Sequence, residues 1–156
     1  KMVIMRFATV FGVSDRMRFD LTINQFTREI FLNKSLNIFG MSTWRPYCHV
    51  KDVARAILKT LKIKKNLSIF NVGNSKQNYS KRDVVNAIGK FLLLKNITYS
   101  KQDILDKRDY KVNFNKIYKD LEFKTKFDLS YGIKEIIKFL KKNKNKNLYD
   151  KKFSNT

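Results

Sequence analysis

The chain has 156 residues, a length that fits one ordinary domain. Hydrophobic residues make up 43% and aromatic residues 13%, which suffices for a packed core and excludes wholesale disorder. Five glycines and one proline exclude collagen-like and low-complexity chains, while a net charge of +21 raises nucleic-acid binding as a function.

The lysines are scattered along the whole chain, which is typical of a sequence-wide lysine and asparagine bias. We therefore expect no nucleic-acid partner and keep a basic nucleic-acid-binding domain as an alternative. Arginine is more informative, because its planar fork can hold a phosphate through two parallel hydrogen bonds. The arginines of the first 55 residues are Arg6, Arg16, Arg18, Arg28, Arg45 and Arg55. Loops rich in arginine indicate a di-anionic ligand such as a pyrophosphate.

The chain contains one cysteine, Cys48, so it cannot form an internal disulfide. A lone cysteine suits a reducing compartment. No apolar run approaches the length of a membrane span, and the first residues lack the layout of a signal peptide. We expect a cytoplasmic protein with no membrane partner.

Strands alternate with helices along the chain, which indicates an α/β or α+β fold. The expected elements of the first part are a strand at 3–7, a loop at 8–19, a helix at 20–33, strands at 36–39 and 46–50, and a helix opened by Asp52. Asp20 is placed to cap the first helix. The second helix carries Val53, Ile57 and Leu61 on one stripe.

The apolar run at 3–7 predicts a strand that is buried on both faces. Such a strand needs neighbours, and it begins almost at the first residue of the sequence. This placement is the first hint of a chain cut from something larger.

The second part contains a predicted strand at 68–72, a helix opened by a capping box of Ser80 and Asp83, strands at 96–99 and 110–112, a helix at 115–121 and a last helix capped by Asp128 or Ser130. The last helix presents Ile133, Ile136, Ile137 and Leu140 to the core. Residues 143–156 are rich in lysine and asparagine, and we expect them to be disordered.

The usual catalytic signatures are absent from the sequence, including GxxxxGK[ST], GxGxxG, paired CxxC and HExxH. His49 is the only histidine, and its place in a short strand favours a structural role. Cys48 is interpreted as a small buried hydrophobic residue. One histidine and one cysteine fall short of a metal site, so none is expected.

Three blocks of the sequence resemble the extended short-chain dehydrogenase/reductase family, the NAD-dependent epimerases and dehydratases of nucleotide sugars. Residues 6–12, RFATVFG, are similar to the family's R-x-x-N-x-Y-G element. Residues 36–40 and 44–56 are similar to its hydrophobic–YG and R-D-[YFW]-x-x-V-x-D-x-A-x-A block. Residues 70–73, 108–110 and 116–123 are similar to its F-N-[IV]-G, R-x-G-D and K-A-x-x-x-L-G-[WF] segments.

The resemblance implies a fold and a ligand. The expected fold is α/β, the C-terminal portion of a Rossmann-type extended fold with the small α+β substrate-binding subdomain. The implied ligand is a nucleotide-diphosphate sugar, with Arg45 and Arg108 as its diphosphate contacts. The other implied substrate contacts are Arg16, Asp20, Leu21 and the strand of Leu36, Ile38 and Phe39, whose backbone reads the base in relatives. Thr9 is the implied contact to the cofactor.

The family's chemistry uses NAD on a Gly-rich turn and a Tyr-x-x-x-Lys pair, and the sequence has neither. We therefore expect residues 1–142 to be the C-terminal, substrate-binding part of such an enzyme, inactive alone and with no catalytic residue of its own. NAD and a missing N-terminal Rossmann half are implied partners. A free-standing module that complements a separate N-terminal half, and a decayed gene product, stay open.

Overall fold

The computed structural model describes residues 2–64, 67–100 and 108–155. The strands are β1 Met2–Phe7, β2 Thr9–Phe11, β3 Leu36–Phe39, β4 Trp44–His49, β5 Leu67–Val72, β6 Asn78–Ser80 and β7 Ile97–Ser100. The helices are α1 Thr22–Phe31, α2 Val50–Thr60, α3 Lys81–Gly89, α4 Asn115–Leu121 and α5 Leu129–Lys142. Two short 3-10 turns, η1 Ser75–Gln77 and η2 Lys151–Phe153, complete the described elements.

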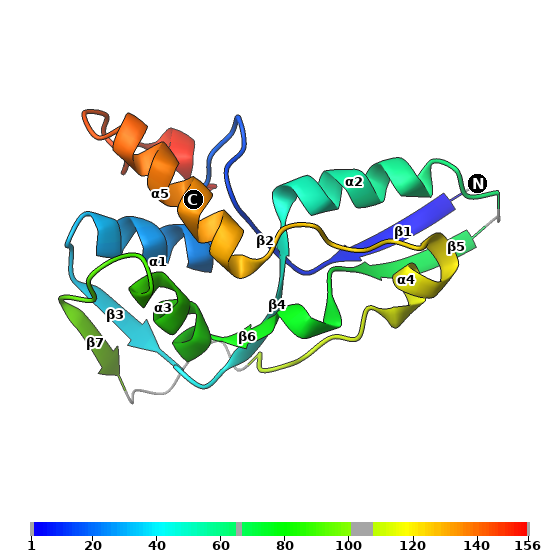
Figure 1. Ribbon diagram of the computed structural model, residues 1–156, viewed down its shortest axis with the longest axis horizontal. Coiled ribbons are helices and arrows are strands. Elements are labelled where there is room, and N and C mark those ends of the chain that lie inside the picture. Colours follow the sequence, from blue (N-terminus) through cyan, green and yellow to red (C-terminus); the bar gives the residue numbers. More distant parts are fainter. Residues whose placement is uncertain (1, 65–66, 101–107, 156) are drawn as a thin grey trace.

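The strands form three small sheets, ordered β1-β5, β2-β4-β6 and β3-β7 within the described residues. The β1–β5, β2–β4 and β3–β7 pairs are parallel, and β4 pairs with β6 in the antiparallel sense. Figure 1 shows β1 and β5 at one end of the molecule with α2 along them, and α1, α3, β3 and β7 at the other end. β4 runs between these two ends and so connects them.

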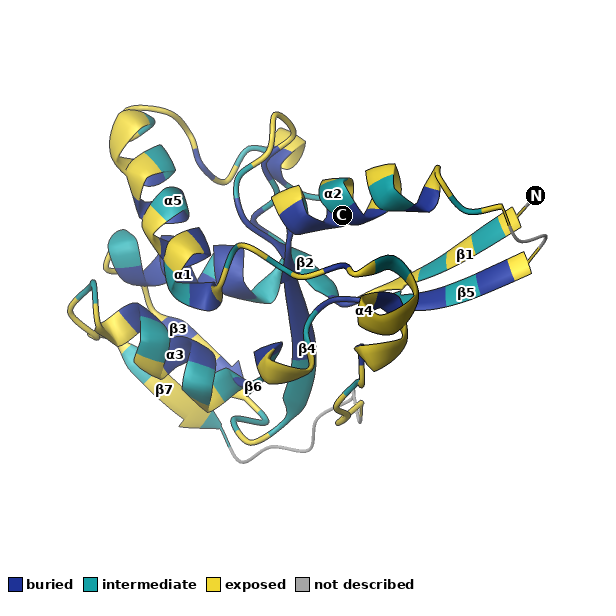
Figure 2. Cartoon of the chain, turned by 45° about the vertical axis from the view of Figure 1, so that its right-hand side comes forward, coloured by how far each residue is buried: buried dark blue, intermediate teal, exposed yellow. Residues whose placement is uncertain are grey.

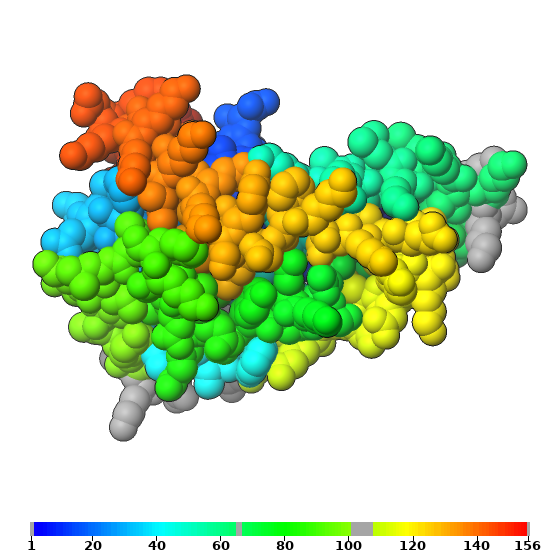
Figure 3. Space-filling view, in the orientation of Figure 1, coloured from blue at the N-terminus to red at the C-terminus, as the bar shows by residue number. Residues whose placement is uncertain are grey.

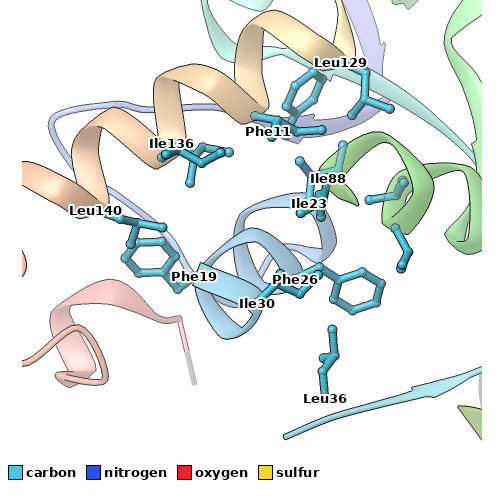
Figure 4. Close-up of a cluster of buried hydrophobic side chains, with 14 of the residues drawn as sticks. Phe11, Phe19, Ile23, Phe26, Ile30, Leu36, Ile88, Leu129, Ile136 and Leu140 are labelled. Carbon is cyan, nitrogen blue, oxygen red and sulfur yellow. The ribbon is translucent and has the colours of Figure 1, made fainter. Parts of the chain in front are cut away.

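The larger core lies between α1, α3 and α5. Its labelled members in Figure 4 include Ile23 and Ile30 of α1, Ile88 of α3, and Ile136 and Leu140 of α5. A smaller core lies between α2, β5 and α4, and its buried members are Ala8, Cys48, Val53, Ala56, Phe70, Val72, Phe114, Ile117 and Phe123. In α5, the predicted core face of Ile133, Ile136, Ile137 and Leu140 is buried, so the apolar periodicity of the last helix is confirmed.

Several predicted boundaries are confirmed by the structure. The strand at 36–39 and the helix at 115–121 have the expected bounds, and β5 and β7 differ from expectation by one residue. Ser80 and Asp83 form the predicted capping box, in which each side chain accepts a hydrogen bond from the other residue's backbone. Asp128 caps α5 by accepting a hydrogen bond from the Tyr131 amide.

The expectation that the first strand is buried on both faces is wrong for this chain. Val3 and Met5 pack against the smaller core, while Met2 and Ile4 are 55% and 39% exposed. Figure 2 shows β1 alternating between half-buried and exposed residues. Helices cover one face of the β1–β5 pair, so the other face of β1 keeps its apolar side chains in solvent.

The packed face of α2 also differs from the predicted stripe. The helix begins at Val50, two residues before Asp52, and it buries Asp52, Val53, Ala56 and Thr60. Ile57 and Leu61, predicted to face the core, are 41% and 75% exposed. Small side chains on the buried face let the helix lie close to the sheet, which turns the larger ones outward.

Residues 110–112, predicted as a weak strand, are irregular in the structure. The expected disorder of residues 143–156 is also wrong for the described residues up to 155. Leu148 and Phe153 are buried in the larger core, at 3% and 9% exposure. These two apolar side chains hold a segment whose composition alone predicts a solvated tail.

Among the described residues, no helix combines the length and the apolar character needed to cross a bilayer.

Candidate functional site

The loop of residues 12–21 joins β2 to α1, and we call it the site loop. It borders a cavity of about 460 Å³ that is lined by three of the expected site residues, Thr9, Arg16 and Leu21. The remaining lining residues come from β2, the site loop, α1 and the first residue of α2. The cavity therefore lies where the end of β2 meets the starts of two helices.

Asn24, which sequence reasoning missed, fastens the site loop to α1. Its side chain is buried, accepts a hydrogen bond from the Gly12 amide at 3.0 Å, and donates to the carbonyls of Gly12 at 3.2 Å and Arg18 at 2.8 Å. Gly12 has a φ of +107°, and a Cβ there would lie 2.4 Å from Nε2 of His49. No pattern in the sequence signals this anchor, because Asn24 lies about 100° round the helix from Ile23 and so off the apolar stripe of α1.

His49 and Glu135 hold the site loop from its other side, although 86 residues separate them. Nε2 of His49 lies 3.0 Å from Oε2 of Glu135, and the same oxygen accepts a hydrogen bond from the Val13 amide at 3.1 Å. The Lys51 amide donates to Nδ1 of His49, so Nε2 carries the proton and His49 is neutral. Lys51 also pairs with the Glu135 carboxylate through its ammonium group.

Electrostatics explain the charge states of this cluster. Burial lowers the pKa of His49, and the Glu135 carboxylate opposes that effect without reversing it. Burial alone would raise the pKa of Glu135, but hydrogen bonds from Lys51 and the Val13 amide hold it below its ordinary value. The predicted structural role of His49 is confirmed, since the side chain is fully buried and caps α2.

Acidification from pH 7 to pH 5.5 is expected to lower the free energy of unfolding. Because the pKa of His49 is lower in the folded chain, the unfolded chain binds more protons below about pH 6.5, and stability falls with pH there. His49 is the only histidine, so urea unfolding of the wild type and of His49→Gln isolates its effect. The glutamine can still donate to Glu135, and its variant should show the flatter pH dependence. Equal slopes for the two proteins would contradict this assignment.

Asp20 does not cap α1, contrary to expectation. The N-cap residue is Leu21, and no side chain caps this helix end. Arg18 instead holds the Asp20 carboxylate with two hydrogen bonds, of 3.0 and 2.6 Å, and these hold the pKa of Asp20 below its ordinary value. The pair carries no net charge, so Asp20 repels an anion in the adjoining cavity less than an isolated carboxylate would.

Arg45 and Arg108 lie next to each other, although 63 residues separate them in the sequence. Nη1 of Arg45 donates to the backbone carbonyls of Trp44, at 2.9 Å, and of Arg108. The Tyr110 amide donates to the Trp44 carbonyl at 3.2 Å, and the Trp44 amide donates to Asp109 at 2.7 Å. These contacts bind residues 108–110 to the start of β4 and bring the two predicted diphosphate arginines together.

Tyr47 connects this arginine pair to the start of α1. It lies two residues after Arg45 in β4, on the same face of the strand. Burial raises the pKa of its hydroxyl to about 12, and the side chain of Thr22, the first residue of α1, opposes this shift. Arg45 lies near the start of β4, and Val50, which follows the end of the same strand, lines the cavity.

The strand of Leu36, Ile38 and Phe39 takes a different part in the site. Leu36 and Ile38 are 5% and 1% exposed, so their side chains belong to the core and only their backbone could meet a ligand. Phe39 is exposed, and its carbonyl accepts a hydrogen bond from Lys81 at 2.6 Å. The short connection from β3 to β4 places Phe39 near Arg45 along the chain.

Cys48 is not a reactive thiol. It is fully buried in the smaller core, and burial raises the pKa of its thiol to about 12. The interpretation of Cys48 as a small hydrophobic residue is confirmed.

The chain is similar to several known proteins. Residues 1–73 match the model of the NAD dependent epimerase/dehydratase family. An uncharacterised protein of Methanocaldococcus jannaschii is 29% identical over 150 residues, which are 92% of this chain and 44% of that protein. The chain thus spans less than half the length of this curated relative.

Solved structures share the fold. A UDP-glucose 4-epimerase of Thermotoga maritima, solved with UDP-glucose, matches 90% of the chain and 46% of its own length, with a TM-score of 0.78 and 22% identity. A UDP-glucuronic acid 4-epimerase of Bacillus cereus, solved with UDP-glucuronic acid and NAD, matches 90% of the chain and 45% of its own length, with a TM-score of 0.77 and 24% identity. The expected α/β fold of the epimerase type is therefore confirmed.

Proposed function

We propose that this chain is the nucleotide-diphosphate-sugar-binding part of an NAD(P)-dependent sugar-nucleotide epimerase/dehydratase. The contact of the Arg45 guanidinium with the backbone of Arg108 at the start of β4 carries the proposal. Guanidinium groups supply paired N–H donors that match the oxygens of a pyrophosphate, and their positive charge balances its negative charge, so we assign both arginines to the diphosphate. The ring of Tyr110, with its centroid 5.1 Å from Cζ of Arg45, helps to hold the Arg45 guanidinium in place.

We assign the base and the sugar of the ligand to residues on either side of the diphosphate. The backbone of Leu36 to Phe39 would face the base, and Leu21 and Arg16 would face the sugar from the cavity. Asp20 lies near the diphosphate in this arrangement, and its ion pair with Arg18 reduces the repulsion between its carboxylate and the phosphates. This layout is supported by the shared cavity lining and by the link from Arg45 through Tyr47 to Thr22.

The resemblance to the family suggests NAD as the cofactor, whereas no site in the described part of this chain does. The sequence has no Gly-rich dinucleotide turn and no Tyr-x-x-x-Lys pair. Thr9 is the one residue that we assign to the cofactor, and a single hydroxyl at a cavity wall does not make a dinucleotide site. The described residues therefore do not hold NAD by themselves, and we derive no hydride or proton transfer for them.

A complementary N-terminal half would supply what is missing. Parallel sheets are normally covered on both faces, yet the outer face of β1 leaves Met2 and Ile4 in solvent, and Phe7 at the end of the strand is 46% exposed. Additional strands and helices of a Rossmann sheet would bury these side chains. A cytoplasmic location belongs to the same proposal, since Cys48 is a free buried thiol.

Calorimetric titration separates this function from the nucleic-acid alternative. At 150 mM salt, UDP-glucose is expected to bind with a Kd below about 1 mM, or roughly −4 kcal/mol, while NAD and free glucose show no heat of binding. The chain alone should form no NADH and no epimerised sugar. Absence of UDP-glucose binding, together with tight and steeply salt-dependent binding of a single-stranded oligonucleotide, would favour the nucleic-acid alternative.

A further inference from the structure

Residues 147–155 cross back over α1 and the site loop after the end of α5, and we call them the strap. Figure 3 shows the orange residues of α5 beside the blue loop that follows β2, and Figure 1 shows the red turn beyond α5 close to the same loop. The strap contains the turn η2, whose N-cap Asp150 accepts a hydrogen bond from the Lys152 amide at 3.0 Å. Leu148 and Phe153 anchor it in the larger core.

The strap also completes a buried ion pair on α1. Arg28 and Glu29 are both 8% exposed, and Arg28 donates to Glu29 and to the Leu148 carbonyl. The Tyr149 hydroxyl donates to Glu29 at 2.6 Å, and the Tyr149 ring lies 4.1 Å from Cζ of Arg28. Buried charges are costly without such partners, so these contacts bind the strap firmly to α1.

From this anchor the strap reaches the site loop. The Phe19 amide donates to the Phe153 carbonyl at 2.7 Å, and the two rings lie 5.6 Å apart in an edge-on arrangement. Asn155 then contacts two of the proposed ligand residues: its side-chain oxygen accepts from Arg16 at 2.8 Å, and its amide donates to Asp20 at 3.4 Å. Arg16 lines both the site cavity and a second cavity of about 470 Å³ beside the strap.

We infer that the strap is a positioning element of the ligand site, which holds the site loop so that Arg16 and Asp20 keep one arrangement. The inference rests on the proposed function, because the site loop borders the proposed sugar cavity. Core packing alone would account for Leu148 and Phe153, but it does not require the polar contacts of Asn155 at the exposed Arg16. A loop fixed before binding loses less conformational freedom when the ligand arrives, which increases affinity.

Two measurements on the full chain test the inference. Without any ligand, amide hydrogen exchange at Phe19 should accelerate at least about 100-fold when residues 147–156 are deleted, while the α3 amides stay protected. Asn155→Ala should weaken UDP-glucose binding about threefold without changing the melting temperature, and Asn145→Ala, an exposed asparagine outside the strap, should bind as the wild type does. In an Arg16→Ala background, Asn155→Ala should have no further effect, because both changes remove one contact.

The outcomes distinguish this inference from the proposed function. If the wild type does not bind UDP-glucose, the proposed function fails, and the exchange at Phe19 still reports on the strap. If the wild type binds UDP-glucose and Asn155→Ala binds equally well, the positioning role is wrong. Additive effects of Arg16→Ala and Asn155→Ala would overturn it as well. Asn155→Ala leaves the apolar anchors in place, so this arm of the test holds even if the deletion variant does not fold.

Discussion

Arg45→Ala is expected to weaken the binding of UDP by about 10- to 100-fold, which corresponds to roughly 1.4–2.8 kcal/mol. The half-buried guanidinium is held by the carbonyls of Trp44 and Arg108 and by the Tyr110 ring, so its donors are in place before the ligand arrives. Alanine removes the charge and the fork together. Calorimetric titration of UDP into wild type and variant at 150 mM salt measures the loss.

Two further variants separate the fork from the charge. Arg45→Lys keeps the charge but loses the paired donors, and we expect most of the affinity loss to persist. Arg6→Ala removes the same charge from an exposed position in β1 and should leave the Kd unchanged. If Arg6→Ala weakens binding as much as Arg45→Ala does, net charge and not the arginine pair attracts the ligand.

Asp52→Ala is expected to destabilise the fold by about 3–5 kcal/mol, the largest effect on stability among our predictions. Asp52 is fully buried at the start of α2, and its carboxylate accepts hydrogen bonds from the amides of Lys126 and Phe127 at 3.0 Å and from Arg55. Alanine leaves these donors without partners and frees the segment that leads into α5. Urea unfolding followed by circular dichroism measures the loss.

Asp120→Ala provides the matched control for this prediction. Asp120 is exposed on α4, so its replacement should change the free energy of unfolding by less than about 0.5 kcal/mol. A loss below about 1 kcal/mol for Asp52→Ala would show that water satisfies these amides, and that Asp52 does not hold the segment.

Local sequence patterns predicted the elements whose stability is local. The capping box of Ser80 and Asp83 and the apolar face of α5 depend on residues three or four positions apart, and both are confirmed. Asp20 failed as a cap because Arg18, two residues earlier, binds its carboxylate. Propensity carries no information about such a competing partner.

Long-range contacts explain the remaining differences. Leu148 and Phe153 stand isolated among lysines and asparagines, and only their contacts with the larger core make the strap ordered. The pairing of His49 with Glu135 likewise joins residues far apart in the sequence. The resemblance named Arg45 and Arg108 as ligand residues, but their contact through the Arg108 carbonyl was visible only in the structure.

The most direct test of the central claim is a titration of the ¹⁵N-labelled chain with UDP-glucose, followed by amide chemical shifts. The account predicts that the shifted amides belong to residues 9–22, 43–47 and 108–111, which surround the arginine pair and the site cavity. A second, weaker set in residues 153–155 would follow from the contact of the strap with the site loop. Shifts scattered over surface lysines, or confined to the cleft of Lys59, Lys62 and Lys64, would contradict the proposed site.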